Sequence, residues 1–142
     1  MQTTSGSQSI LFAGAFLRDS TVPDAMKACI EACATCAAVC EQTERYCLEK
    51  GREHAAAPHI GVLQDCIEMC NTAARFMLRR SARHAIACRT CAEICEACAT
   101  DCDRFADDAV MRQCAATCRA CAATCRRRHC RSAGRSRCRR GR

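Results

Sequence analysis

The chain has few of the side chains that usually build a protein core. Among its 142 residues there is no tryptophan, and aromatic residues account for only 4%. Leucine, isoleucine, valine and phenylalanine are too few for a conventional core, because alanine and cysteine supply most of the apolar residues. The length is typical of one domain. Packing alone is therefore expected to give only modest stability.

Long apolar segments are also absent. No run of apolar residues approaches the roughly 18 that a membrane-spanning helix requires. The segment 1–20 contains one apolar stretch, Ile10 to Leu17, but neither a basic region before it nor a twin arginine. This is a poor export signal. We therefore expect no membrane association and a cytoplasmic location, where thiols stay reduced unless a metal binds them.

Charge is unevenly distributed along the chain. The formal net charge is +7, yet residues 126–142 carry nine arginines and no acid. Removing nine arginines from +7 leaves −2 for residues 1–125, so the body of the chain is nearly neutral. The Arg-rich tail over residues 131–142 is interpreted as a solvated segment. Weak contact with a polyanion is its alternative role, although no aromatic residues for base stacking lie among the arginines.

Cysteine is abundant, and its spacing is regular. Sixteen of the eighteen cysteines recur in steps of three, four or seven residues, which is the spacing of one face of an α-helix. These sixteen, here called the sulfur seam, are Cys29, Cys33, Cys36, Cys40, Cys47, Cys66, Cys70, Cys88, Cys91, Cys95, Cys98, Cys102, Cys114, Cys118, Cys121 and Cys125. Cys130 and Cys138 lie off this pattern.

The four segments of the seam predict four helices. Short connections between them favour an all-α fold, an antiparallel up-down-up-down four-helix bundle with a cysteine-lined core. The helices are expected over residues 24–50, 58–80, 83–104 and 108–128. The bundle then occupies residues 21–130, after a segment over residues 1–20 that is loosely ordered or forms a short helix.

Local signals place the ends of these helices. Thr21 is expected to cap the first helix, with Pro23 in its first turn and Gly51 just after its last residue. Asp107 or Asp108 is expected to cap the fourth helix.

The spacing of the seam indicates metal binding. Residues three or four apart on a helix place their Cβ atoms roughly 5–6 Å apart, so two thiolates can hold one ion and a shared thiolate can bridge two. Cu(I) fits best, because it is soft, accepts thiolates alone and tolerates low coordination numbers. One Cu⁺ per thiolate is electrically neutral, whereas Zn(Cys)₄ leaves two negative charges per site. No position stays open to a substrate, which favours storage or sequestration over catalysis.

Two other functions remain open at this point. The chain is alternatively a zinc or general thiolate metal buffer, or a redox-regulated, polyanion-binding adaptor whose cysteines are structural. A disulfide scaffold is disfavoured, because pairs three or four residues apart on a straight helix do not suit disulfide geometry. An iron–sulfur site is disfavoured as well, because Cys88, Cys91 and Cys95 resemble a cluster triplet but no proline follows.

Other soft ligands gather where the helices begin and end. Thr43, His59, Met77 and Met111 occupy positions on the seam face that lack cysteine. Antiparallel packing places a first group of soft ligands at one end of the bundle: Met26, Met77, His84 and His129. The opposite end carries Cys47, His59 and Met111. Thioether and imidazole bind Cu(I) more weakly than thiolate does, as a loading gate requires. We therefore favour the first group as the copper entrance and keep the second as its competitor; the alternative is that these methionines only fill the core.

Four motifs together carry a family resemblance. They are "CIEACATCAAVC", "CIEMC", "CRTCAEICEACATDC" and "CAATCRACAATC", in this order over residues 24–125. The chain resembles the copper storage proteins, a bacterial family of cysteine-rich four-helix bundles. The resemblance implies a bundle whose interior binds many Cu(I) ions through cysteine thiolates, commonly assembled as a homotetramer. We also expect a copper donor to deliver the ions at one end of the bundle. Without a twin-arginine signal, the chain is similar to the cytosolic members.

Overall fold

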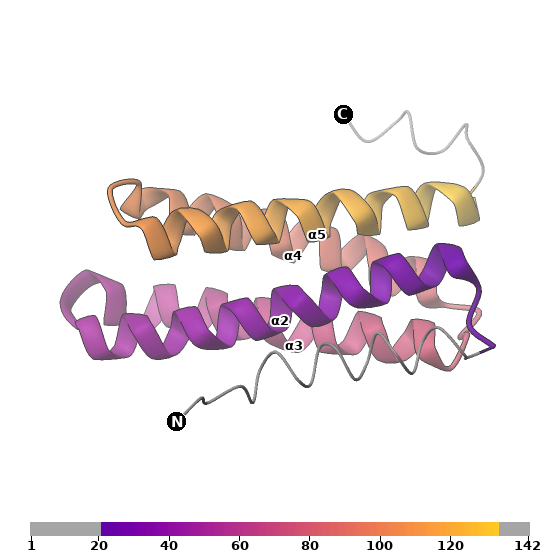
Figure 1. Ribbon diagram of the computed structural model, residues 1–142, viewed down its shortest axis with the longest axis horizontal. Coiled ribbons are helices and arrows are strands. Elements are labelled where there is room, and N and C mark those ends of the chain that lie inside the picture. The colour runs from indigo at the N-terminus through magenta and orange to yellow at the C-terminus, as the bar shows by residue number, and fades with distance from the viewer. Residues whose placement is uncertain (1–20, 134–142) are drawn as a thin grey trace, which may run out of the picture.

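Four long antiparallel helices form the part of the chain that the structure describes (Figure 1). The computed structural model describes residues 21–133, with side chains as far as Arg128. In chain order the elements are α2 (Asp24–Lys50), η1 (Arg52–Ala55), α3 (Ala57–Leu78), α4 (His84–Cys102), η2 (Asp103–Phe105) and α5 (Ala109–Ala133). The predicted all-α, up-down-up-down four-helix bundle is confirmed. The segment 1–20, the residues after 133 and the side chains of His129 and Cys130 lie outside the description.

The four helices are arranged as a square. Helix α2 packs against α3 and α5, and α4 packs against the same two helices from the other side. Two ends result, which we name by their connections. At the turn end α3 passes into α4, while α2 begins and α5 ends there; at the loop end the connections through η1 and η2 lie together (Figure 1).

Small side chains make the core. Every seam cysteine is at most 1% exposed. Alanines flank the sulfur atoms on each helix and are buried with them, as Ala37, Ala73, Ala99 and Ala122 are. Leu63 is the largest fully buried aliphatic side chain. Cysteines three or four residues apart lie on one face of each helix. This face packs into the core, so the sulfur atoms point toward the shared axis.

The first helix begins differently from the expectation. Pro23, and not Thr21, is the N-cap, and no side chain caps this terminus. The Pro23 carbonyl accepts hydrogen bonds from the backbone N–H groups of Met26 at 2.8 Å and Lys27 at 3.2 Å. Proline serves here because its fixed φ of −57° leads directly into the first turn. The prediction that Thr21 caps this helix is therefore wrong.

The other helix ends follow the sequence signals more closely. Gly51 closes α2 with a φ of 77°, a conformation that glycine adopts without strain, and its N–H donates to the Cys47 carbonyl at 3.0 Å. Asp108 accepts a hydrogen bond from the Val110 N–H at 2.9 Å, which confirms it as a cap of α5. Helix α5 continues to Ala133, five residues beyond its expected end. None of the described helices has a stretch long and apolar enough to span a bilayer.

Candidate metal centre

The sulfur seam lies inside the bundle along its whole length. All sixteen cysteines are free thiols and buried. Four other side chains on the seam face are equally buried: Thr43, His59, Met77 and Met111, each at most 2% exposed. Seam positions without cysteine therefore still face the axis, as the spacing predicts.

Neighbouring sulfur atoms form an unbroken path. Starting at the turn end, it runs through Sγ atoms of Cys29, Cys125, Cys33, Cys121, Cys70, Cys95, Cys66, Cys36, Cys118, Cys40 and Cys114. Each step is between 3.5 and 4.0 Å. A disulfide bond measures about 2.05 Å, so these are contacts between separate thiols. A soft ion between two such atoms has the next sulfur within reach.

The path joins helices that do not pack side by side. Cys66 and Cys70 of α3 contact Cys118 and Cys121 of α5 at 4.0 Å, across the diagonal of the square. Sulfur from all four helices therefore meets at the axis. Sets of four thiols, each with all Sγ atoms within 4.8 Å of one another, occur repeatedly. Several of these sets share members, since Cys36, Cys66 and Cys118 each belong to two.

Thiols in this core do not ionise independently. The hydrogen bond to Cys118 lowers the pKa of Cys36 to about 7. Hydrogen bonds to Cys114 and Cys118 raise the pKa of Cys40 well above its usual range. A sulfur that accepts a hydrogen bond from its neighbour ionises more easily, while the donor keeps its proton. Without a cation the buried seam holds most of its protons, so each incoming ion must displace them.

At the loop end three different soft ligands meet. The Cys47 Sγ lies 3.5 Å from the His59 Nε2 and 3.6 Å from the Met111 Sδ. The other ring nitrogen of His59 lies 2.5 Å from a carboxylate oxygen of Asp101. A carboxylate in this position fixes the ring so that Nε2 faces the sulfur atoms. Burial raises the pKa of Cys47 to about 11, so this thiol also keeps its proton until a cation replaces it.

The predicted ligands of the turn end are more dispersed. The Met77 Sδ lies 3.8 Å from the Cys88 Sγ, and both side chains are fully buried. Met26 is 7% exposed. His84 is half-buried, and its Nδ1 lies 2.8 Å from the Ser81 carbonyl oxygen, to which it donates. The side chain of His129 lies outside the described residues.

Two residues at the loop end were missed by the sequence reasoning. Asp101, which orients His59, lies one position before Cys102 and was grouped with no site. Phe105 of η2 lies between two histidines, with ring centroids 4.1 Å from His54 and 4.9 Å from His59. The signal for Asp101 was its step of three from Cys98, which places it beside the seam face. Nothing in the spacing pointed to Phe105, because it follows the last seam residue of α4.

Thr43 occupies the position on the seam face of α2 between the sulfur path and this cluster. Its hydroxyl donates to the Val39 carbonyl at 2.8 Å, one helical turn earlier. The side chain therefore fills a seam position that offers no sulfur, between Cys40 and Cys47. The loop-end cluster differs from the path in its ligands, because imidazole and thioether accompany a single thiol.

Comparison with known proteins gives a consistent result. The profile of the family described as copper storage protein matches residues 22–132. A crystal structure of a protein from Nitrosospira multiformis is 40% identical, with a TM-score of 0.70, over 74% of this chain and 94% of that one. The Cu(I)-bound copper storage protein BsCsp3 is 35% identical, with a TM-score of 0.69, over 73% of this chain and 97% of that one.

Two further similarities involve Bacillus subtilis. The apo form of its copper storage protein 3 is 35% identical, with a TM-score of 0.66, over 72% of this chain and 97% of that one. An uncharacterized cysteine-rich protein, YhjQ, is 36% identical over 68 residues, which are 48% of this chain and 63% of that protein. This chain thus spans just under two thirds of that relative's length. A thiol-lined bundle core and a family profile that covers nearly the whole bundle lead to one conclusion: the chain belongs to the copper storage protein family.

Proposed function

We propose that the chain stores and sequesters multiple Cu(I) ions on the thiolates of the sulfur seam. The observation that carries this proposal is the continuous path of Sγ contacts, with steps of 3.5–4.0 Å, through the buried core. Each ion replaces thiol protons and binds between neighbouring sulfur atoms, and shared thiolates link one ion to the next. The Cu(I)-bound relative, matched over 73% of this chain, supports Cu(I) as the cargo.

A zinc buffer is the second candidate, because the core also offers sets of four thiols. Three of these sets share no cysteine: the first holds Cys33, Cys91, Cys121 and Cys125, the second Cys36, Cys66, Cys70 and Cys95, and the third Cys40, Cys98, Cys114 and Cys118. A Zn²⁺ ion in each set would leave two negative charges in a buried core. Cu(I) avoids this cost because one monovalent ion balances one thiolate.

Anaerobic titration distinguishes these functions. With a competing chelator present, we expect the chain to take up about one Cu(I) per seam thiol, while Zn²⁺ saturates at about three or four ions. Free thiols counted before the titration should include all sixteen seam cysteines. Tight zinc binding with poor retention of Cu(I) would favour the zinc buffer, and native thiols already oxidised would favour the redox adaptor.

A passive role follows from the burial of the seam. Every seam thiol is at most 1% exposed, so the coordination of a bound ion is filled by protein sulfur. We therefore propose that the chain is not an enzyme. Assays of oxidase activity with the Cu(I)-loaded protein should show no turnover above that of free copper complexes.

We also propose the turn end as the copper entrance. Met77, which contacts Cys88 at 3.8 Å, and the half-buried His84 supply ligands weaker than thiolate beside the first sulfur atoms of the path. Replacing both by alanine should slow Cu(I) uptake while the final capacity changes little. If His59→Ala with Met111→Ala slows uptake and the turn-end pair does not, copper enters at the loop end.

The proposal also covers the cellular location of the protein, its oligomeric state and its Arg-rich tail. Sixteen free thiols require a reducing compartment when no metal is bound, which supports a cytoplasmic location. The family resemblance supports a homotetramer, and light scattering of the intact chain tests the assembly. A copper donor supplies the ions in this proposal. Deleting residues 131–142 should leave the copper capacity nearly unchanged and should weaken any contact with polyanions.

A further inference from the structure

The two ends of the bundle differ in how their charges are balanced. At the loop end, three acidic side chains have cationic partners: Asp108 lies 2.8 Å from Lys50, Asp101 lies 2.8 Å from Arg104, and Asp103 pairs with Arg119. At the turn end, Asp24 lies 3.2 Å from Lys27. The turn end is rich in arginine from α3, α5 and the α3–α4 turn. These residues are Arg75, Arg79, Arg80, Arg83, Arg126, Arg127 and Arg128.

Most turn-end arginines have no carboxylate partner. Among the described side chains, no acid lies within ion-pair distance of Arg75, Arg79, Arg80, Arg83 or Arg127, while Arg126 reaches Glu96 at 3.2 Å. Arg79 lies over the Phe76 ring at 4.3 Å, an interaction that leaves its charge in place. The turn end therefore presents a positive field to solvent, and such a field attracts anions.

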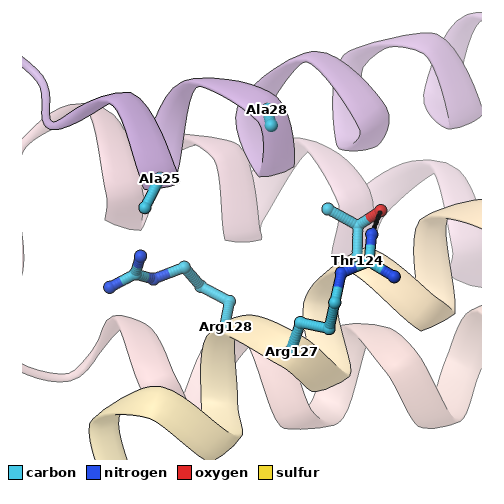
Figure 2. A pocket seen from close by; sticks show the side chains of 5 residues that line it. All are labelled: Ala25, Ala28, Thr124, Arg127 and Arg128. Carbon is cyan, nitrogen blue, oxygen red and sulfur yellow. Dashed lines mark hydrogen bonds between the residues drawn. The ribbon is translucent and has the colours of Figure 1, made fainter.

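A notch between α2 and α5 lies within this positive field. Ala25, Ala28, Thr124, Arg127 and Arg128 line it, and its volume is about 160 Å³. Figure 2 shows the Arg128 side chain extending toward Ala25, while Arg127 lies beside Thr124. An Arg127 guanidinium nitrogen donates to the Thr124 hydroxyl oxygen at 3.1 Å, which holds this side chain at the notch. The notch opens to solvent and has room for a small carboxylate-bearing group.

The notch lies beside the first pair of seam thiols. Cys29 follows Ala28 in α2, and Cys125 follows Thr124 in α5. The Sγ atoms of these two cysteines are 3.6 Å apart and begin the sulfur path. A molecule held in the notch therefore lies against the residues that directly precede, in α2 and in α5, the first two cysteines of the sulfur path.

We propose that this notch docks an anionic Cu(I)–thiolate complex, in which a small thiol with free carboxylates carries the copper to the store. The inference rests on the proposed storage function and specifies its donor. Arginine suits this role because its planar guanidinium binds carboxylates through two parallel hydrogen bonds. Copper passes by ligand exchange: a Cu–S bond to the donor breaks, a Cu–S bond to Cys29 or Cys125 forms, and the cysteine proton leaves with the donor thiol. No oxidation state changes.

Stopped-flow uptake from two donors tests the proposal. The intact chain and its R127Q/R128Q variant are mixed without oxygen with Cu(I)–glutathione, which carries carboxylates, or with Cu(I) bound to 2-mercaptoethanol, which carries none. At low ionic strength, we expect uptake from glutathione to slow about fivefold or more in the variant, and uptake from 2-mercaptoethanol to stay unchanged. The matched control, R45Q/R52Q, removes the same charge at the loop end and should change neither rate.

The outcomes separate recognition from other effects. Equal slowing with both donors, equal slowing in the loop-end control, or no slowing at all would overturn the docking site. Low Cu(I) capacity in the unaltered chain would instead contradict the storage function itself. A second measurement needs no variant: S-methylglutathione, which has the carboxylates but no free thiol, should slow uptake from Cu(I)–glutathione by competition. Failure to compete at millimolar concentration would contradict the proposal even if the variant did not fold.

Discussion

Polar contacts at the loop end converge on Asp108, a side chain only 10% exposed. Burial alone would raise the pKa of this carboxyl, but hydrogen bonds from the Lys50 ammonium and the Tyr46 hydroxyl, both at 2.8 Å, outweigh it. The pKa of Asp108 is consequently held well below its usual range. The same carboxylate accepts a hydrogen bond from the Val110 N–H, so one side chain joins α2 to the start of α5.

This pKa predicts an acid-sensitive contribution to stability. A carboxyl whose pKa is lower when folded stabilises the fold fully above its unfolded value near pH 4, and the contribution is lost as the pH falls further. Asp108→Asn should reduce the free energy of unfolding of the apo protein at pH 7 by about 1–3 kcal/mol. Anaerobic denaturation between pH 2.5 and 7 should show that the variant loses less stability on acidification than the unaltered chain.

Asp107 provides the control for this measurement. It is the exposed neighbour of Asp108, so Asp107→Asn makes the same chemical change away from the hydrogen-bond network. It should leave both the stability and its pH dependence nearly unchanged. An equal loss in both variants would mean that overall charge, and not the Asp108 contacts, sets the acid sensitivity.

The loop-end cluster makes a second prediction at the same scale. If Cys47, His59 and Met111 hold one ion, His59→Ala should remove about one Cu(I) equivalent and leave the thiolate path filled. Asp101→Asn keeps the imidazole but weakens its orientation, and should lower the affinity of that one equivalent about 10- to 100-fold. Titration against a graded series of Cu(I) chelators measures both effects.

A nearby histidine tests whether this effect is specific. His54 belongs to the same end, but it contacts Asp108 and Phe105 and not the sulfur atoms of the cluster. His54→Gln should retain the full number of ions. An unchanged titration of His59→Ala would show that the cluster is only a core plug.

Helix α3 differs from its neighbours because it contributes only two seam cysteines. Aliphatic and thioether side chains fill the rest of its inner face, including Leu63, Ile67 and Met77, all buried. This helix therefore supplies much of the conventional packing in a core otherwise lined by thiols. The stability that α3 contributes should therefore depend more strongly on the volume of its buried hydrocarbon side chains than the stability contributed by the other helices.

Leu63→Ala tests this difference between elements. The side chain is fully buried, so its truncation should destabilise the apo protein by about 2–5 kcal/mol, with part of the loss arising from the cavity left behind. Leu48→Ala is the control, because Leu48 is 52% exposed and should change stability by less than about 0.5 kcal/mol. Anaerobic urea denaturation measures both, and similar losses would contradict the assignment of α3.

The elements also show which structural features the sequence could predict. Periodic cysteines identified four helices and their inward face, because a side chain three or four residues from a buried neighbour remains on the same face. Helix ends depended on local chemistry: Gly51 and Asp108 met the expectation, whereas Pro23 capped α2 in place of Thr21. Phe105 could not be assigned beforehand, since its position between two histidines arises only when η1 and η2 meet at one end.

At the scale of the whole molecule, the formal charge of the metal-loaded core depends on how many thiolates coordinate each ion. When each Cu⁺ replaces one thiol proton and each thiolate bridges two ions, the formal charge of the bundle does not change. Isolated sites of two thiolates per Cu⁺ would instead add about one negative charge each, and Zn(Cys)₄ sites would add about two. These alternatives differ in total charge although they occupy the same sulfur atoms.

Anaerobic isoelectric focusing therefore reports on the arrangement of the ions. Because the buried seam thiols of the apo protein keep their protons, we expect its isoelectric point to remain nearly constant as Cu(I) is added up to saturation, with about one proton released per ion. Loading with Zn²⁺ should move the band toward acid with each equivalent. A progressive acidic shift with Cu(I) would contradict the bridged path, because only separate anionic sites accumulate charge as they fill, and a low-dielectric core lined from end to end by sulfur disfavours that accumulation.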